Sequence, residues 1–300
     1  MKITKPPQAM PRQAARSISG FVRPSKVISL LAALVLTGAA AQADPAPRRV
    51  VSMNLCTDQL AMLLADPGQI VSLSYLSTDQ RSSAMAEQAA SFPRNQGQAE
   101  EIYLLNPDLV LSGRYTGVAT VNMLKRLGER VEVFLPAYSL TDVRERMLQM
   151  GRALGQQDRA AALVARFDAD LGVLRENVQN RPLAALYYAN GYTTGDKTLA
   201  GQILLAAGFD NAAVKAGQSR GGNLPLEVLV MMQPEAVVTG AKYPGQSRSE
   251  AILDHPVIRA LQKDRETGSV ADSDWLCGTP YVLRAVADLV ALRHRVESAE

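Results

Sequence analysis

The sequence predicts an α/β protein with two lobes, each built on a mainly parallel central sheet, joined by one long connecting helix. Short apolar segments alternate with helical segments on both sides of the chain's middle, a pattern typical of parallel sheets covered by helices. Between residues 139 and 180 this alternation stops, and two helical patterns follow each other without a strand. A strand-and-loop pattern near Pro107 also recurs near Pro234, once on each side of the helical stretch.

Residues 1–43 have the pattern of a signal peptide, which we expect to be cleaved. They contain six basic residues and no acidic one, then an apolar run from Val27 to Ala41 that ends in small residues. The run is shorter than the ~20 residues that a membrane-spanning helix needs. Without this leader, 26 Lys and Arg stand against 29 Asp and Glu, so the mature chain is weakly acidic. Its charge therefore gives no support for nucleic-acid binding.

The first lobe is expected at residues 49–138, within a domain that covers residues 49–298. Its helix at 99–106 should stop at Pro107, because the residue before a proline avoids the helical region. The helix at 120–128 should close on Gly128. Its strands are expected at residues 48–53, 69–74, 108–112 and 131–135, and a first helix at 57–67.

The connecting segment, residues 139–180, contains apolar side chains at helical spacing throughout. We expect two helices with a break at Gly155, the second running from about Gln156 to Gln179. The second lobe, residues 182–298, returns to the alternating pattern. Its strands are expected at residues 183–189, 235–240 and 268–272, and its helices at 199–208, 226–232 and 281–296.

The repeated pattern is "NPDLVLSGRYTG" in the first lobe and "QPEAVVTGAKYPG" in the second. Glu100 stands seven residues before Pro107, and Glu227 stands seven residues before Pro234. Ligands of parallel α/β sheets bind at the carboxyl ends of strands. The loops that follow the two repeated strands are therefore expected to line one cleft.

Four segments in this order resemble the periplasmic substrate-binding proteins of the ABC importers for vitamin B12, ferric siderophores and haem. They are "RRVVSMNLCTDQLAMLLADP", "GQAEEIYLLNPDLVLSG", "LPLEVLVMMQPEAVVTG" and "SVADSDWLCGTP". The resemblance implies a monomeric periplasmic protein that binds a metal chelate, such as a ferric siderophore, a corrinoid or haem, and carries no resident cofactor. It also implies that one acid of each lobe docks on the importer's membrane subunits. Glu100 and Glu227 match these acids, although an acid at a helix start is also favoured by the helix dipole alone.

Candidate ligand contacts are the aromatic, basic and polar residues that directly follow predicted strands. Flat aromatic faces suit a macrocycle, and basic groups suit an anionic chelate, so this mixture does not choose between the ligands. Trp275 is the strongest single candidate, because the resemblance places a cleft aromatic there. The full set is Asn54, Cys56, Tyr75, Arg114, Tyr115, Tyr188, Tyr192, Lys242, Tyr243 and Trp275. A bare metal site is not expected, because His255 and His294 are poorly placed to act as ligands.

Cys56 and Cys277 are the two cysteines of the chain, and both should border the cleft from opposite lobes. Three interpretations remain open: a disulfide, a thiol pair that touches ligand or metal, and two unrelated thiols. An oxidising compartment favours the disulfide.

A serine hydrolase is the alternative function, because "GQSRG" places Ser219 in a G-x-S-x-G motif. That mechanism needs a strand before the serine and a helix directly after it. The neighbouring residues predict neither, so we expect a binding protein and not an enzyme.

Overall fold

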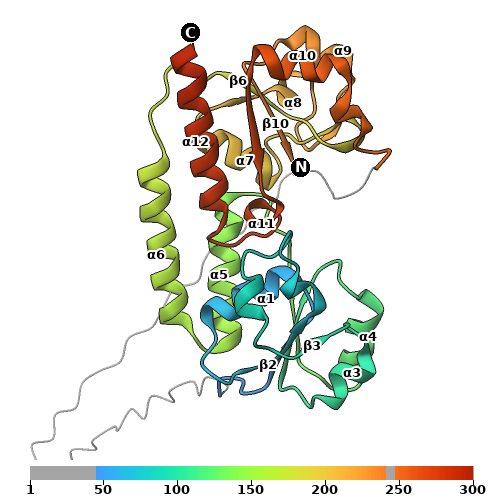
Figure 1. Cartoon of the computed structure of the whole chain (residues 1–300). Coiled ribbons are helices and arrows are strands. Elements are labelled where there is room, and N and C mark those ends of the chain that lie inside the picture. The colour runs from blue at the N-terminus through green and yellow to red at the C-terminus, as the bar shows by residue number, and fades with distance from the viewer. Residues whose placement is uncertain (1–44, 241–246, 300) are drawn as a thin grey trace, which may run out of the picture. The chain divides into compact units, whose positions relative to one another are not determined.

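The computed structural model describes residues 45–240 and 247–299 (Figure 1). The predicted signal peptide lies outside these residues, as do the candidate ligand contacts Lys242 and Tyr243. The residues from Asp44 onward belong to one structural unit, so the two lobes can be described together.

The first lobe contains a parallel sheet in the order β3-β2-β1-β4-β5. The central strands β1 and β4 are almost wholly apolar and buried, as expected of a parallel sheet covered on both faces. The strands are β1 (Val50–Ser52), β2 (Ile70–Ser74), β3 (Arg94–Asn95), β4 (Leu109–Gly113) and β5 (Val131–Phe134). The helices are α1 (Leu55–Leu64), the short 3-10 helix η1 (Tyr75–Thr78), α2 (Ala86–Ala89), α3 (Ala99–Leu104) and α4 (Val118–Arg126).

The second lobe contains a parallel sheet in the order β11-β10-β6-β8 and a separate antiparallel pair, β7 with β9. Its strands are β6 (Leu183–Leu186), β7 (Tyr192–Thr193), β8 (Asp210–Asn211), β9 (Gly222–Asn223), β10 (Ala236–Gly240) and β11 (Glu266–Val270). Its helical segments are η2 (Ala189–Gly191), α7 (Leu199–Ala206), α8 (Ala212–Lys215), α9 (Leu226–Met232), η3 (Ala251–Asp254), α10 (Pro256–Asp264), α11 (Asp272–Trp275) and α12 (Val282–Ala299).

Two helices connect the lobes, α5 (Leu140–Leu154) and α6 (Gln157–Leu174). The first begins with a capping box, in which Ser139 and Asp142 each bond the other's backbone N–H. It ends at Gly155, whose φ of 74° is the left-handed conformation that glycine adopts without strain. The predicted fold class is thereby confirmed, together with the break at Gly155, although α6 ends at Leu174 and not near Gln179.

The largest apolar cluster is shared by both lobes and the connecting helices. It includes Leu64 of the first lobe, Met147 of α5, Phe167 of α6, and Leu186 and Val286 of the second lobe. In Figure 1, α6 lies beside α12, and α5 lies between the elements of the two lobes. Because the core is continuous through α5, moving one lobe against the other would disturb packed side chains.

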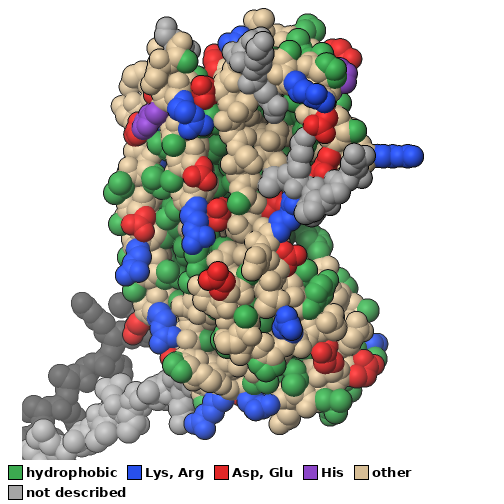
Figure 2. All heavy atoms as spheres, viewed as in Figure 1, with side chains coloured by type: hydrophobic (Ala, Val, Ile, Leu, Met, Phe, Trp, Pro, Cys, Tyr) green, Lys and Arg blue, Asp and Glu red, His purple; other side chains and the backbone are tan. Residues whose placement is uncertain are grey.

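Acidic and basic side chains alternate over the face seen in Figure 2, and no large area of one charge is visible there. Among the described residues, no helix is both long enough and apolar enough to cross a membrane.

Candidate functional site

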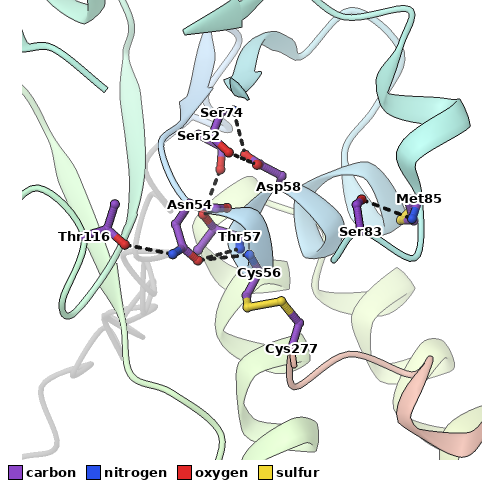
Figure 3. Close-up of a disulfide and its surroundings, with 10 residues drawn as sticks. All are labelled: Ser52, Asn54, Cys56, Thr57, Asp58, Ser74, Ser83, Met85, Thr116 and Cys277. Atoms are coloured by element: carbon purple, nitrogen blue, oxygen red, sulfur yellow. Dashed lines mark hydrogen bonds between the residues drawn. A yellow bond between two sulfur atoms is a disulfide. The ribbon is translucent and has the colours of Figure 1, made fainter. Parts of the chain in front are cut away.

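The loops after β1 and β4 lie side by side, and Asn54 connects them. Its Oδ1 accepts hydrogen bonds from the backbone N–H of Cys56 at 3.0 Å and of Thr57 at 3.4 Å, which caps α1. Its Nδ2 donates to Thr116 Oγ1 at 2.8 Å (Figure 3). Both ends of the amide are therefore engaged by the protein, so Asn54 shapes the two loops whether or not it also contacts a ligand.

A buried carboxyl group lies in the first turn of α1, close to these loops. Asp58 of α1 is fully buried, and its two oxygens accept hydrogen bonds from the backbone N–H of Ser74 at 3.1 Å and the Ser74 hydroxyl at 2.5 Å. Burial raises the pKa of Asp58 to about 7, although the hydroxyl groups of Ser52 and Ser74 act in the opposite direction. The contact ties α1 to the end of β2 beneath the site (Figure 3).

A disulfide joins the start of α1 to the segment between α11 and α12. Cys56 and Cys277 are bonded, with their Cα atoms 5.1 Å apart (Figure 3). The next residue, Gly278, lies so close to the first lobe that a Cβ built there would come within 2.3 Å of the Ala137 Cβ. The segment thus crosses from the second lobe onto the first, held by a covalent bond and a close packing contact.

A second link between the lobes is an ion pair that no sequence pattern predicts. Arg81, in the loop after η1, places its Nε 2.9 Å from Asp272 Oδ2 at the start of α11. Both side chains are about one-fifth exposed.

A pocket of about 350 Å³ opens over the carboxyl ends of β1, β4 and β5. This volume lies within the range of about 300–1,000 Å³ that is usual for small-molecule sites. Most of its wall belongs to the first lobe, while Leu276 and Gly278 close it from the disulfide-linked segment. The lining residues are Asn54, Leu55, Cys56, Thr57, Leu60, Leu76, Gly113, Arg114, Tyr115, Thr116, Phe134, Leu135, Pro136, Ala137, Arg146, Leu276 and Gly278.

Four predicted ligand contacts, Asn54, Cys56, Arg114 and Tyr115, line this pocket together. The described candidates that do not line it are Tyr75, Tyr188, Tyr192 and Trp275. Tyr75 and Tyr192 are 51% and 45% exposed, so their rings remain accessible from solvent.

Tyr188 and Trp275 contact each other in the second lobe. Their ring centroids are 5.6 Å apart with the planes at 73°, an edge-to-face arrangement that stabilises aromatic pairs. Both rings are partly buried and pack on the shared core. Burial also raises the pKa of the Tyr188 hydroxyl above its ordinary value. This packing gives both residues a structural role, and the predicted contact of each with ligand stays a prediction.

Residues of both lobes approach Tyr138, an exposed side chain that precedes α5. A hydrogen bond with Tyr115 raises the pKa of Tyr138, whereas the charge of Arg220 acts in the opposite direction. Tyr115 is 75% exposed and lines the pocket. Arg220 belongs to the second lobe, so side chains of both lobes act on Tyr138.

Several residues of the pocket wall are not among the predicted ligand contacts, and Arg146 is the most informative of them. Phe134, Leu135, Pro136 and Ala137 follow a predicted strand and could have been included by the rule applied elsewhere. Arg146 lies on α5, three residues after Val143 and four before Met150, both of them fully buried. An arginine at a buried position of a helical pattern is the signal that could have identified it.

Up to the end of the repeated strand, the two copies of the repeat have the same local structure. In each, a short helix carries an exposed glutamate in its first turn, Glu100 in α3 and Glu227 in α9. Each helix is followed by a left-handed residue before proline, Asn106 with φ 48° and Gln233 with φ 45°. The neighbouring Glu101 is engaged within the lobe, because it accepts a hydrogen bond from the Gln96 N–H at 2.7 Å. Glu100 is therefore the better placed of the two acids for an external contact.

Ser219 does not have the setting of a hydrolase nucleophile. It is exposed in a bend that follows α8 and precedes the two-residue strand β9, so the order strand, serine, helix is not formed. His255 caps α10, where its Nδ1 accepts from the Val257 N–H at 3.3 Å. His294 contacts Glu176 on the surface of α12. Within the described ranges, no group of three or more His, Cys, Asp or Glu side chains could hold a metal ion.

A family model described as "periplasmic binding protein" matches residues 50–265 of the chain. A comparison with curated proteins gives no match.

Several solved structures share this fold. RhuT, a periplasmic haem-binding protein from Roseiflexus sp. RS-1 in its apo form, is 22% identical, with a TM-score of 0.69. The match covers 83% of this chain and 98% of that one. The periplasmic vitamin B12-binding protein BtuF of Vibrio cholerae is 15% identical, with a TM-score of 0.62 over 84% of this chain and 98% of its own. An ABC-type Fe³⁺-hydroxamate transport system from Saccharomonospora viridis is 21% identical, with a TM-score of 0.63 over 82% and 93%.

Proposed function

We propose that this chain, which belongs to the periplasmic binding protein family, captures a metal chelate between its lobes and delivers it to the membrane subunits of an ABC importer. The mature chain would act as a monomer in the periplasm after export by its leader. No chemical step is required of it, because the importer's other subunits hydrolyse ATP.

The observation that carries this proposal is the pocket at the carboxyl ends of the first-lobe strands. It is mainly apolar, opens beside the repeat loop that contains Arg114 and Tyr115, and is closed by Leu276 and Gly278. An apolar pocket with a few polar groups is the usual form of a small-molecule site. The structural neighbours named for haem, vitamin B12 and Fe³⁺-hydroxamate support a chelate as the ligand class.

The proposed docking contacts are Glu100 and Glu227. Each is exposed, and each occupies the same position of a repeated unit. In the first lobe, the far end of this unit is the loop of Arg114 and Tyr115, which lines the pocket. Charge pairing at such a surface gives specificity and speed of association more than tight binding. The same unit would thus hold a ligand loop at one end and an importer contact at the other.

The ligand class is tested by titrating the mature chain with haem, cyanocobalamin, a ferric trihydroxamate and a ferric tris-catecholate. Trp275 is the single tryptophan of the chain, so its fluorescence reports on the second-lobe side of the cleft. We expect saturable one-to-one quenching by one member, with a rise in melting temperature that follows the ligand concentration. The proposed ligand class is wrong if no chelate changes the fluorescence or the melting temperature of the wild-type chain, and none changes the melting temperature of Trp275→Phe.

A further inference from the structure

We propose that Arg146 at the wall of the pocket binds an acidic group of the ligand, so that the chelate captured here is an anion. This inference rests on the proposed function and narrows it, since neutral and anionic chelates would otherwise be equally acceptable.

Arg146 occupies the side of α5 that faces the site. It lines the pocket with Thr57 and Leu60 of α1 and with Phe134 at the end of β5. Its side chain is only 15% exposed. A guanidinium group is therefore held in a largely apolar wall, where an unmatched charge is unfavourable.

The protein orients this guanidinium group without fully matching its charge. Its Nη1 donates to Gln149 Oε1 at 2.9 Å, and Gln149 in turn donates to Glu132 Oε1 at 2.6 Å. Its Nη2 lies 3.0 Å from Glu145 Oε2, but Glu145 is 57% exposed, and such pairs contribute little. The Nε–H is buried and has no acceptor in the part of the chain that the structure describes. Arginine can bind a carboxylate through two parallel donors, so a ligand oxyanion could offset the charge that Glu145 leaves poorly matched.

The charge of the pocket wall also favours an anionic ligand. Among its described lining residues, the charged ones are Arg146 and Arg114, and both are positive. Arg114 is exposed, so it can meet an anion that approaches the pocket. Nothing on this wall matches a cationic ligand, whereas a ligand with acidic groups would meet a cation at the mouth and another on α5.

The test compares two forms of one ligand and two variants of one helix. Iron protoporphyrin IX carries two carboxylates, and its dimethyl ester carries none; a ferric tris-catecholate and an uncharged ferric trihydroxamate extend the comparison. The variants are Arg146→Gln and Arg152→Gln. Arg152 is an exposed arginine on the same helix that does not line the pocket, so its replacement removes the same charge elsewhere.

We expect the wild-type chain to bind an anionic member of this panel and to bind its neutral counterpart at least about tenfold more weakly. Arg146→Gln should weaken binding of the anionic member by about ten- to a hundredfold, which is the effect of losing one charge-assisted hydrogen bond. The affinity of Arg152→Gln for the same ligand should stay within about twofold of the wild-type value. Arg146→Lys should recover part of the loss, because it restores the charge without the planar fork.

Binding of only neutral members, or equal affinity of Arg146→Gln and Arg152→Gln for the anion, would overturn the inference and leave the proposed function in place. Binding of no member of this panel would overturn the inference, and failure of cyanocobalamin to bind as well would overturn the proposed function. The comparison of iron protoporphyrin IX with its ester, or of the two ferric chelates, uses the wild-type chain alone. It therefore tests the preference for an anion even if Arg146→Gln does not fold, and Arg146→Lys then tests the contribution of Arg146 itself.

Discussion

Asp58 shows how a single residue under the pocket can set the pH response of the whole chain. Its carboxyl group is buried in the first turn of α1, and its two oxygens accept hydrogen bonds from the Ser74 N–H at 3.1 Å and the Ser74 hydroxyl at 2.5 Å. The pKa of Asp58 is raised from 3.8 to about 7, so the folded state retains a proton that the unfolded state has already released. Folding therefore becomes less favourable as pH rises from about 4 to about 7, and the loss is complete above that window.

Replacing Asp58 with Asn should remove this pH dependence. Asparagine can accept from the Ser74 N–H and donate to the Ser74 hydroxyl, so both contacts can be kept without a titrating group. We expect the urea midpoint of the wild-type chain to fall, relative to Asp58→Asn, between pH 4.5 and 7.5. A constant difference between the two midpoints over that range would show that Asp58 titrates normally.

A side chain at position 278 would collide with Ala137, so Gly278 cannot be replaced without a loss of stability. Gly278→Ala should destabilise the chain by about 1–3 kcal/mol, the usual effect of overpacking. Gly172, an exposed glycine in α6 with open space around it, is the matched control. Gly172→Ala should instead stabilise by about 0.5–1 kcal/mol, because alanine favours the helix. Urea unfolding of both variants measures this, and equal effects of the two changes would refute the close contact.

Site residues could be predicted from sequence only where they directly follow a strong strand. Arg114 and Tyr115 were found in this way, because β4 is a continuous apolar run with a clear end. Arg146 was missed, because it lies in the middle of a helix whose other buried positions are apolar. Whether Tyr188 and Trp275 point at ligand or at each other depends on packing between segments about ninety residues apart, which no local pattern encodes.

At the scale of elements, the disulfide fixes α1 to the segment before α12. It closes a loop with a sequence separation of 221 residues, so it removes much freedom from the unfolded chain. The ion pair between Arg81 and Asp272 links the same two parts of the molecule, from η1's loop to α11. The disulfide and the ion pair therefore add to the contacts between the lobes that the shared apolar core already makes.

Replacing Cys56 and Cys277 together with Ser should lower the free energy of unfolding by about 2–5 kcal/mol. Reduction of the wild-type chain should lower its urea midpoint toward that of the double variant, while the variant itself should not respond to the reductant. Two reactive thiols in the unreduced wild-type chain, or equal midpoints for all samples, would show that the bond does not form.

The main helices and strands were predictable because each has a full apolar pattern or a clear boundary residue. Gly155 ends α5 in a left-handed conformation, and Pro107 follows α3. The missed elements are short: β3 and β8 have two residues each, and α11 has four. α10 was also missed, although Pro256 at its first position is a common start signal. Two-residue strands exist only through pairing with a neighbour, so local sequence does not reveal them.

At the scale of the whole molecule, the shared core argues against a free hinge between the lobes. The residues of α5 pack with both lobes in one cluster, and the disulfide adds a covalent link at the pocket. A ligand would then be recognised by a site that is largely formed before binding, which reduces the entropy lost on association.

The proposed importer contact predicts that Glu100→Lys with Glu227→Lys abolishes chelate uptake in cells that lack their own copy, while ligand affinity is unchanged. The effect would arise from like-charge repulsion at the docking surface. Asp170→Lys with Asp288→Lys is the matched control, because both are exposed acids on the long helices α6 and α12. If uptake survives the two glutamate reversals, or falls equally in the control, Glu100 and Glu227 are not the docking contacts.

We claim that the pocket between β1, β4, β5 and the disulfide-linked segment is the place where the ligand binds. Equilibrium dialysis of the chelate panel against the mature chain and a pocket-filled variant, Leu276→Trp, tests it directly. Leu276 is 56% exposed and lines the pocket, so a larger ring there should obstruct the site without disturbing the core. We predict one-to-one saturable binding of a chelate by the wild-type chain and at least about tenfold weaker binding by Leu276→Trp. Equal binding by both chains, or no binding of any chelate by the wild-type chain, would contradict the claim.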